Sequence, residues 1–220
     1  SHWKQFRKTI TQAGMWLRIY HDNMGALKTA PLPIKDIRFE MDHVMDGLAK
    51  ASQDKTLQRL VRAAFDRVLD TLQGSTVSIG ELHGDFTLGN TYITPDGEVG
   101  GIDFEGVTRG PVFKDIARLI VDIEVHKALR HGYIVYFPRL QRCISAFLDG
   151  YYQSESCDLQ VLYLYCALEV IKRWLRFESS SLYSSGPKRK IKRITLFYIR
   201  MFVRFLLLNK YLLVGKKNYK

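Results

Sequence analysis

Apolar positions recur at helical spacing along most of the chain. Over residues 3–21 they fall three and four positions apart, which predicts a first helix. A Pro-Leu-Pro segment at 31–33 then interrupts the pattern, and a short helix is expected near residues 36–49. The longest apolar stripe covers residues 57–72, which predicts a helix with one buried face that ends at Gly74.

The middle of the chain has a different, β-like pattern. Residues 77–82 alternate apolar with small or polar positions, as expected of a half-buried strand. Two further β-prone runs, 91–94 and 98–102, flank a Pro-Asp-Gly sequence at 95–97. Because proline, aspartate and glycine each favour tight turns, this arrangement predicts a β-hairpin.

Helical spacing returns after the hairpin. The helices expected there cover residues 114–129, 138–152, 158–177 and 190–214. The order of helices, a small β insert and further helices predicts an α+β fold that is mainly α. Neither of the two common glycine-rich phosphate-binding sequences occurs in the chain.

The charge of the chain is unevenly distributed and changes this picture at the C-terminus. The 33 basic and 22 acidic residues give a net charge of +11, but no Asp or Glu follows Glu178. Residues 1–178 are therefore close to neutral, which argues against a globally basic nucleic-acid-binding protein. The three cysteines form no CxxC pair, so neither a disulfide framework nor a structural zinc site is expected. This cysteine usage favours a cytoplasmic location.

The basic excess lies in a segment that follows a serine-rich stretch. Three regions are predicted: a domain over 1–178, a linker over 179–187 and a basic amphipathic helix over 188–220. A membrane span is disfavoured, because each central Arg or Lys costs about 2.5–3.5 kcal/mol and each Leu, Ile or Phe returns only about 0.3–0.6. Two alternatives remain for 188–214. The helix either docks on the anionic inner surface of the membrane, or packs on the domain with its basic face in water.

The β insert also carries polar residues that can act together. Asp85 follows the predicted strand, Asn90 precedes the hairpin, and Asp103 follows it. Because a hairpin brings its two ends together, Asn90 and Asp103 are expected to share a small volume. An amide oxygen and a carboxylate suit a hard cation such as Mg²⁺, and Asp85 could orient or deprotonate an attacking hydroxyl.

With their spacing, these residues resemble the aminoglycoside phosphotransferase and choline kinase superfamily, small-molecule kinases with a protein-kinase-like fold. The resemblance covers about residues 12–177, from the AGMWLRIYH sequence at 13–21 onward. The motif residues are His83, Asp85, Asn90, Ile102, Asp103, Phe104, Glu105, Gly110, Pro111, Asp115 and Ala117.

The resemblance implies a role for each main residue of the motif. Asp85 would be the catalytic aspartate, and Asn90 and Asp103 would bind Mg²⁺ and through it the phosphates of ATP. His83 would brace the catalytic loop through hydrogen bonds. Asp115 would open the following helix and fix the backbone of the loop.

The chain departs from the superfamily in one large respect. Members have an N-terminal β-rich lobe with an adenine-binding clamp and a phosphate-binding lysine, and the large-lobe helix begins here almost at residue 1. Either this is the large lobe of a longer kinase, or it is a non-catalytic scaffold or membrane-docking module without a nucleotide lobe. The expected activity is phosphoryl transfer from ATP to a hydroxyl of a small molecule, such as a sugar, a lipid-linked sugar or an amino alcohol. A third alternative is a kinase that acts on protein side chains, but the Ile102–Glu105 and Gly110–Ala117 motifs resemble the small-molecule branch more closely.

Two further residues have more than one interpretation. Glu105 lies either near the phosphates or substrate, or in the loop as an ordinary carboxylate. His21, at the end of the first helix, is interpreted as a helix-end cation or a packing residue.

Overall fold

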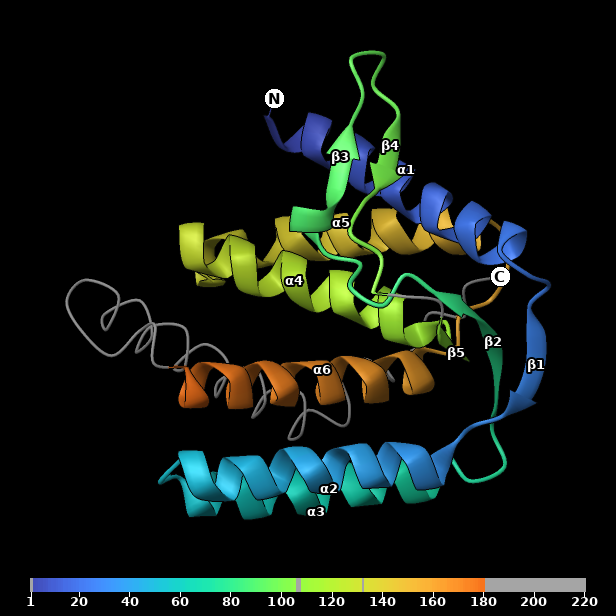
Figure 1. The fold of residues 1–220 in the computed structure, drawn as a ribbon. Coiled ribbons are helices and arrows are strands. Elements are labelled where there is room, and N and C mark those ends of the chain that lie inside the picture. Colours follow the sequence, from blue (N-terminus) through green and yellow to red (C-terminus); the bar gives the residue numbers. More distant parts are fainter. Residues whose placement is uncertain (1, 106–107, 132, 181–220) are drawn as a thin grey trace. The chain divides into compact units, whose positions relative to one another are not determined.

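The computed structural model describes residues 2–105, 108–131 and 133–180 (Figure 1). The chain divides into two compact units. Of the described residues, the first unit contains those up to 31 and those from 76 to 158, and the second contains residues 32–75 and 159–180. The helices are α1 (His2–Asn23), α2 (Ile34–Ala51), α3 (Lys55–Thr71), α4 (Phe113–His131), α5 (Tyr133–Tyr152) and α6 (Leu159–Ser179), with a 3-10 turn η1 at Leu88–Asn90.

The first unit is built on a close pairing of α1 with α5. Two glycines allow this approach, because a Cβ on Gly14 would fall on the carbonyl oxygen of Phe147 and one on Gly150 would fall on the carbonyl oxygen of Thr11. Figure 1 shows α1 beside α5, with α4 also next to α5. Apolar side chains of these helices are buried, among them Ile10, Ala13, Leu17, Ile116, Leu119, Ile123 and Phe147.

Two small antiparallel sheets complete the first unit. One has the order β1-β2-β5, formed by Lys28–Pro31, Thr76–Leu82 and Thr108–Pro111. The other is the hairpin of β3 (Thr91–Ile93) and β4 (Val99–Gly101), which projects beside α1 in Figure 1.

Side chains of α1 hold both ends of this hairpin. The Gln12 side chain donates a hydrogen bond to the carbonyl oxygen of Gly97 in the turn. At the base of the hairpin, the Trp16 ring covers Gly101 so closely that a Cβ there would lie 2.5 Å from it.

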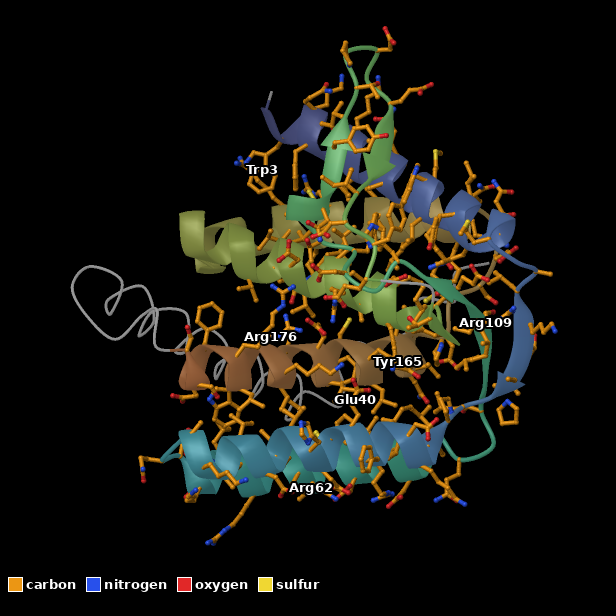
Figure 2. All side chains as sticks on the ribbon, viewed as in Figure 1. Trp3, Glu40, Arg62, Arg109, Tyr165 and Arg176 are labelled. Atoms are coloured by element: carbon orange, nitrogen blue, oxygen red, sulfur yellow. The ribbon has the colours of Figure 1, made fainter. Side chains whose placement is uncertain are left out.

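The second unit consists of α2, α3 and α6, which pack on one another. Asp54 caps the N-terminus of α3 by accepting a hydrogen bond from the backbone N–H of Leu57 at 3.1 Å. Figure 2 shows Glu40 of α2 directed toward α6, where it forms an ion pair with Lys172. The buried face of these helices includes Ile37, Met41, Leu48, Leu57, Val61, Leu69, Val161, Leu164 and Trp174.

The structure confirms that the described residues are mainly helical with a small β-hairpin. The helix expected over 57–72 and the hairpin on either side of 95–97 are both present. Strands β1 and β5 were not predicted, and α5 begins at Tyr133, earlier than the start expected at Pro138.

The C-terminal predictions lie almost entirely outside the described residues. Helix α6 ends at Ser179, and the rest of the expected linker and the basic segment 188–220 follow residue 180. Membrane docking through 188–214 therefore stays a prediction. Within residues 2–105, 108–131 and 133–180, no helix is long and apolar enough to cross a membrane.

Candidate functional site

The loop after β2 carries the first part of the predicted site. It runs from His83 to Thr87 and leads into η1, all within the first unit. Gly84 has a φ of +86°, and a Cβ at this position would lie 2.9 Å from the Cβ of Glu105. The carbonyl oxygen of His83 accepts a hydrogen bond from the backbone N–H of Glu105 at 3.1 Å. The loop after β2 is therefore tied directly to the segment after β4.

Asp115, in the first turn of α4, fixes the backbone at the start of this loop. Its Oδ2 accepts from the N–H of His83 at 2.7 Å, and its Oδ1 accepts from the N–H of Gly84 at 3.0 Å. The Asp115 side chain is only 2 % exposed. Because hydrogen bonds to a charged acceptor are among the stronger ones in proteins, a buried carboxylate in this position holds the loop firmly.

A buried histidine and a tyrosine extend this network away from the loop. His21 lies 3.1 Å from Asp115 Oδ2 through Nε2 and 2.8 Å from the Tyr151 hydroxyl through Nδ1. Since the carboxylate only accepts, Nε2 donates, and with one proton on the ring Nδ1 accepts from Tyr151. Burial raises the pKa of the Tyr151 hydroxyl, which keeps the donor protonated. The C-terminal part of α1 and the end of α5 thus support the loop through Asp115.

The carboxylate of Asp85 is held at both oxygens. Oδ2 accepts from the side-chain amide of Asn90 at 2.8 Å, and Oδ1 accepts from Nη1 of Arg118 at 2.8 Å. The same Asn90 nitrogen also donates to the backbone carbonyl of Asp85 at 2.9 Å. The carboxylate and the backbone carbonyl of Asp85 can only accept hydrogen bonds, so the Asn90 amide must turn its nitrogen toward them. Its Oδ1 is therefore directed away from Asp85.

Asp103 lies next to Asn90 across the base of the hairpin. The backbone N–H of Ile102 donates to the carbonyl oxygen of Asn90 at 2.9 Å. Asp103 directly follows Ile102 in the chain, so the backbones of Asn90 and Asp103 lie close together. Asp103 is exposed and has a φ of +60°, a left-handed conformation that costs a non-glycine residue about 1–2 kcal/mol. Such strain is typical of functional positions, where the surrounding structure imposes it.

The side chains of Asn90 and Asp103 offer the kinds of oxygen atom that a magnesium ion accepts as ligands. The amide oxygen of Asn90 is kept available by the orientation of its nitrogen, and the Asp103 carboxylate is accessible. Mg²⁺ binds proteins through one or two such ligands and completes its shell with water and substrate phosphates. In the part of the chain that the structure describes, no group of three or more His, Cys, Asp or Glu side chains could hold a metal ion.

The His83 side chain lies in an aromatic cluster under the site. Its ring stacks on Phe104 at a centroid distance of 4.4 Å and also contacts Phe86 and Trp16. Burial lowers the pKa of the His83 imidazole, although the negative charges of Asp115 and Asp85 act to raise it. Neither ring nitrogen has a hydrogen-bond partner among the described residues. The loop-bracing hydrogen bonds at this position come from the backbone of His83.

Sequence reasoning missed Arg118 and the pairing of His21 with Tyr151. A signal for Arg118 was available, since Asp115, Arg118 and Asp122 are spaced by three and four residues and so share one face of α4. Asp115 and Arg118 contact the loop, and Asp122 accepts a hydrogen bond from the N–H of Leu88, the first residue of η1, at 2.9 Å. No comparable local signal links His21 to Tyr151.

Comparison with known proteins places this geometry in context. The family model described as "Phosphotransferase enzyme family" matches residues 7–143. No curated protein matches the chain. Among solved structures, a glucosamine kinase is similar with a TM-score of 0.63 and 18% identity, over 92% of this chain and 54% of that one.

Two further structures show the same likeness. Glucosamine kinase in complex with glucosamine, ADP and inorganic phosphate has a TM-score of 0.59 and 16% identity, over 92% of this chain and 53% of that one. An amicoumacin kinase in complex with AMP-PNP, Ca²⁺ and Ami has a TM-score of 0.58 and 18% identity, over 90% and 58%. At this identity the likeness shows a kinase-like fold, and the chain spans only about half the length of these structures.

Proposed function

Since the chain belongs to the phosphotransferase enzyme family, we propose that it forms the large-lobe part of an ATP-dependent enzyme that transfers the γ-phosphoryl group to a hydroxyl of a small molecule. The observation that carries this proposal is the arrangement of Asp85, Asn90 and Asp103. One carboxylate is held at both oxygens, and beside it lie an oriented amide and an accessible carboxylate.

Asp85 would bind and orient the acceptor hydroxyl. Each of its carboxylate oxygens has a second lone pair beyond the one used by Asn90 or Arg118, so the hydroxyl can donate a hydrogen bond to it. In that position Asp85 can also take the hydroxyl proton as the new P–O bond forms. Phosphoryl transfer needs little covalent chemistry from the protein, so accurate positioning of the nucleophile is the main contribution expected.

Asn90 and Asp103 would hold Mg²⁺ with the ATP phosphates. When bound, the ion neutralises negative charge on the transferred group. Support for nucleotide and divalent-metal use comes from the ADP in one similar structure and the AMP-PNP and Ca²⁺ in another.

The acceptor is proposed only as a class. The sugar, lipid-linked sugar or amino alcohol expected from the sequence is compatible with the glucosamine that one similar kinase binds. In this proposal the lobe that would bring ATP to Asp85 lies outside the residues described, in keeping with the share of the similar structures that the chain covers, 54% and 58%.

The test is turnover of the full-length protein with ATP and Mg²⁺ and a panel of acceptors that includes glucosamine, neutral sugars and amino alcohols. Formation of ADP and of phosphorylated acceptor is measured for wild type, Asp85→Asn and Asp96→Asn. Asp85→Asn should lower kcat by about 10²–10⁴-fold, because it removes the proton acceptor. Asp96 lies in the hairpin turn, so its Asn variant is the matched control and should stay within about threefold of wild type.

Two results would contradict the proposal. If Asp85→Asn keeps more than about a third of wild-type kcat, Asp85 has no part in the chemistry. If wild type neither binds ATP nor phosphorylates any acceptor, the non-catalytic scaffold is the better interpretation.

A further inference from the structure

We propose that Arg118 is a positioning residue for the reaction, acting by fixing the carboxylate and backbone of Asp85. This inference rests on the proposed function, because it assigns Arg118 a part in the same phosphoryl transfer. Arg118 comes from α4, on the same helix face as Asp115. Its side chain is 14% exposed, so the contacts that it makes are largely shielded from water.

The first step is the geometry around one nitrogen. Nη1 of Arg118 donates to Asp85 Oδ1 at 2.8 Å and to the carbonyl oxygen of Gly84, and lies 3.8 Å from Glu105 Oε2. The peptide N–H of Gly84 is held at the same time by Asp115. Gly84 is therefore fixed at its N–H and its carbonyl by two side chains of α4, immediately before Asp85.

The second step concerns the rotation of the Asp85 carboxylate. The terminal torsion of an aspartate is broad and roughly two-fold, so a carboxylate without donors turns easily. Here Asn90 donates to one oxygen and Arg118 to the other, which selects one orientation. Because transfer rates fall steeply when reacting groups are misplaced by about 1 Å, loss of one donor should lower kcat.

The third step is the balance of charge. The carboxylates of Asp85 and Glu105 lie 2.8 Å and 3.8 Å from Nη1 of Arg118. The Asp85 side chain is 30% exposed and that of Glu105 is 64% exposed, so the ion pair with Asp85 is the less screened of the two. Of these two carboxylates, Asp85 is therefore the one that Arg118 holds more strongly.

The experiment compares Arg118→Gln, Arg118→Lys and Arg118→Ala in the full-length protein, with Arg109→Gln as the matched control. Arg109 is an exposed residue of β5 that donates to the carbonyl oxygen of Ala26. Arg118→Gln should lower kcat by about 10–100-fold, while KM for ATP and acceptor changes by less than about threefold. Arg118→Lys should recover part of this loss, because it keeps the charge but not the planar fork.

Two further measurements separate positioning from a merely structural role. Free guanidinium at millimolar concentration should raise kcat of Arg118→Ala by about fivefold or more and leave Arg109→Gln unchanged. In the Asp85→Asn background, Arg118→Gln should lower kcat by less than about threefold, because residues that act as a unit are non-additive. The inference would be overturned if the losses of kcat caused by Asp85→Asn and Arg118→Gln multiply in the double variant. It would also be overturned if Arg118→Gln alone keeps more than about a third of wild-type kcat.

A measurement without turnover keeps this inference distinct from the proposed function. Hydrogen–deuterium exchange of the segment 82–90 should be faster in Arg118→Gln than in wild type or Arg109→Gln. If wild type phosphorylates nothing but this exchange increases, the proposed function fails and the positioning by Arg118 stands. Unchanged exchange contradicts the positioning itself.

Discussion

Replacement of Asp115 should loosen the loop that carries Asp85. This buried carboxylate accepts hydrogen bonds from the N–H groups of His83 and Gly84 and from the His21 ring. In Asp115→Asn, one oxygen position becomes an NH₂ group, so at least one of these donors faces another donor. Loss of one hydrogen bond to a charged group costs about 1.5–3 kcal/mol, so unfolding of Asp115→Asn should be easier by about 2–3 kcal/mol.

Asp115→Ala should have a larger effect, because all three donors lose their partner. Each buried donor left without a partner costs about 1–3 kcal/mol, so the loss should exceed that of Asp115→Asn. Urea unfolding followed by tryptophan fluorescence measures the free energy, and exchange of the 82–90 amides localises the change. The control is Asp70→Asn, which removes a surface ion pair with Arg38 and should cost about 1 kcal/mol or less.

The outcome that would refute this reasoning is specific. If Asp115→Ala loses no more free energy of unfolding than Asp70→Asn, the Asp115 network does not hold the loop. Faster amide exchange that spreads over the whole first unit, without a maximum at 82–90, would also contradict it, because general destabilisation would then explain the loss.

Two other predictions concern buried positions. Burial raises the pKa of Glu124 from 4.5 to about 8, so between these values the unfolded state binds fewer protons and stability falls as pH rises. Glu124→Gln should remove this fall, so its free energy of unfolding should exceed that of wild type by up to about 4 kcal/mol at pH 8 and equal it near pH 4. If the free energies of unfolding of wild type and Glu124→Gln, measured in urea, change in parallel from pH 4 to 8, the prediction is contradicted. Gly14→Ala should cost about 1–3 kcal/mol in the same assay, because its Cβ would meet the Phe147 carbonyl. Gly47→Ala, whose Cβ meets only the end of the Leu175 side chain, should change stability by less than about 1 kcal/mol.

Features coded by neighbouring residues were predictable from the sequence. The helix over 57–72 has its own apolar stripe, and the hairpin has its own turn residues at 95–97. The nearness of Asn90 and Asp103 followed from the hairpin, and the hydrogen bond between Ile102 and Asn90 agrees with it. Membership of the phosphotransferase family is confirmed by the family model.

Features that depend on distant parts of the chain were missed. Strands β1 and β5 each have four residues, and proline ends both, so neither has a detectable alternating pattern. They exist because β2 lies between them and supplies their hydrogen-bond partners. His21 meets Tyr151 across 130 positions, and its helix-end location gave no indication of this contact.

The loop after β2 lacks regular secondary structure, and α4 supplies much of its order. Backbone groups of a loop that are removed from water need partners, and here several partners are side chains of one helix. Asp115 and Arg118 bond to the loop backbone, and Asp122 bonds to the N–H of Leu88, where the loop enters η1. The position of Asp85 is therefore set by residues about thirty positions later in the chain as much as by its own motif. It follows that the HGDFTLGN sequence alone does not specify the conformation of this loop; the KDIARLIVD sequence of α4 supplies side chains that fix its backbone. For the same reason, a chain that has His83, Asp85 and Asn90 should have a poorly ordered loop if its α4 lacks the hydrogen-bond acceptors at 115 and 122 and the donor at 118.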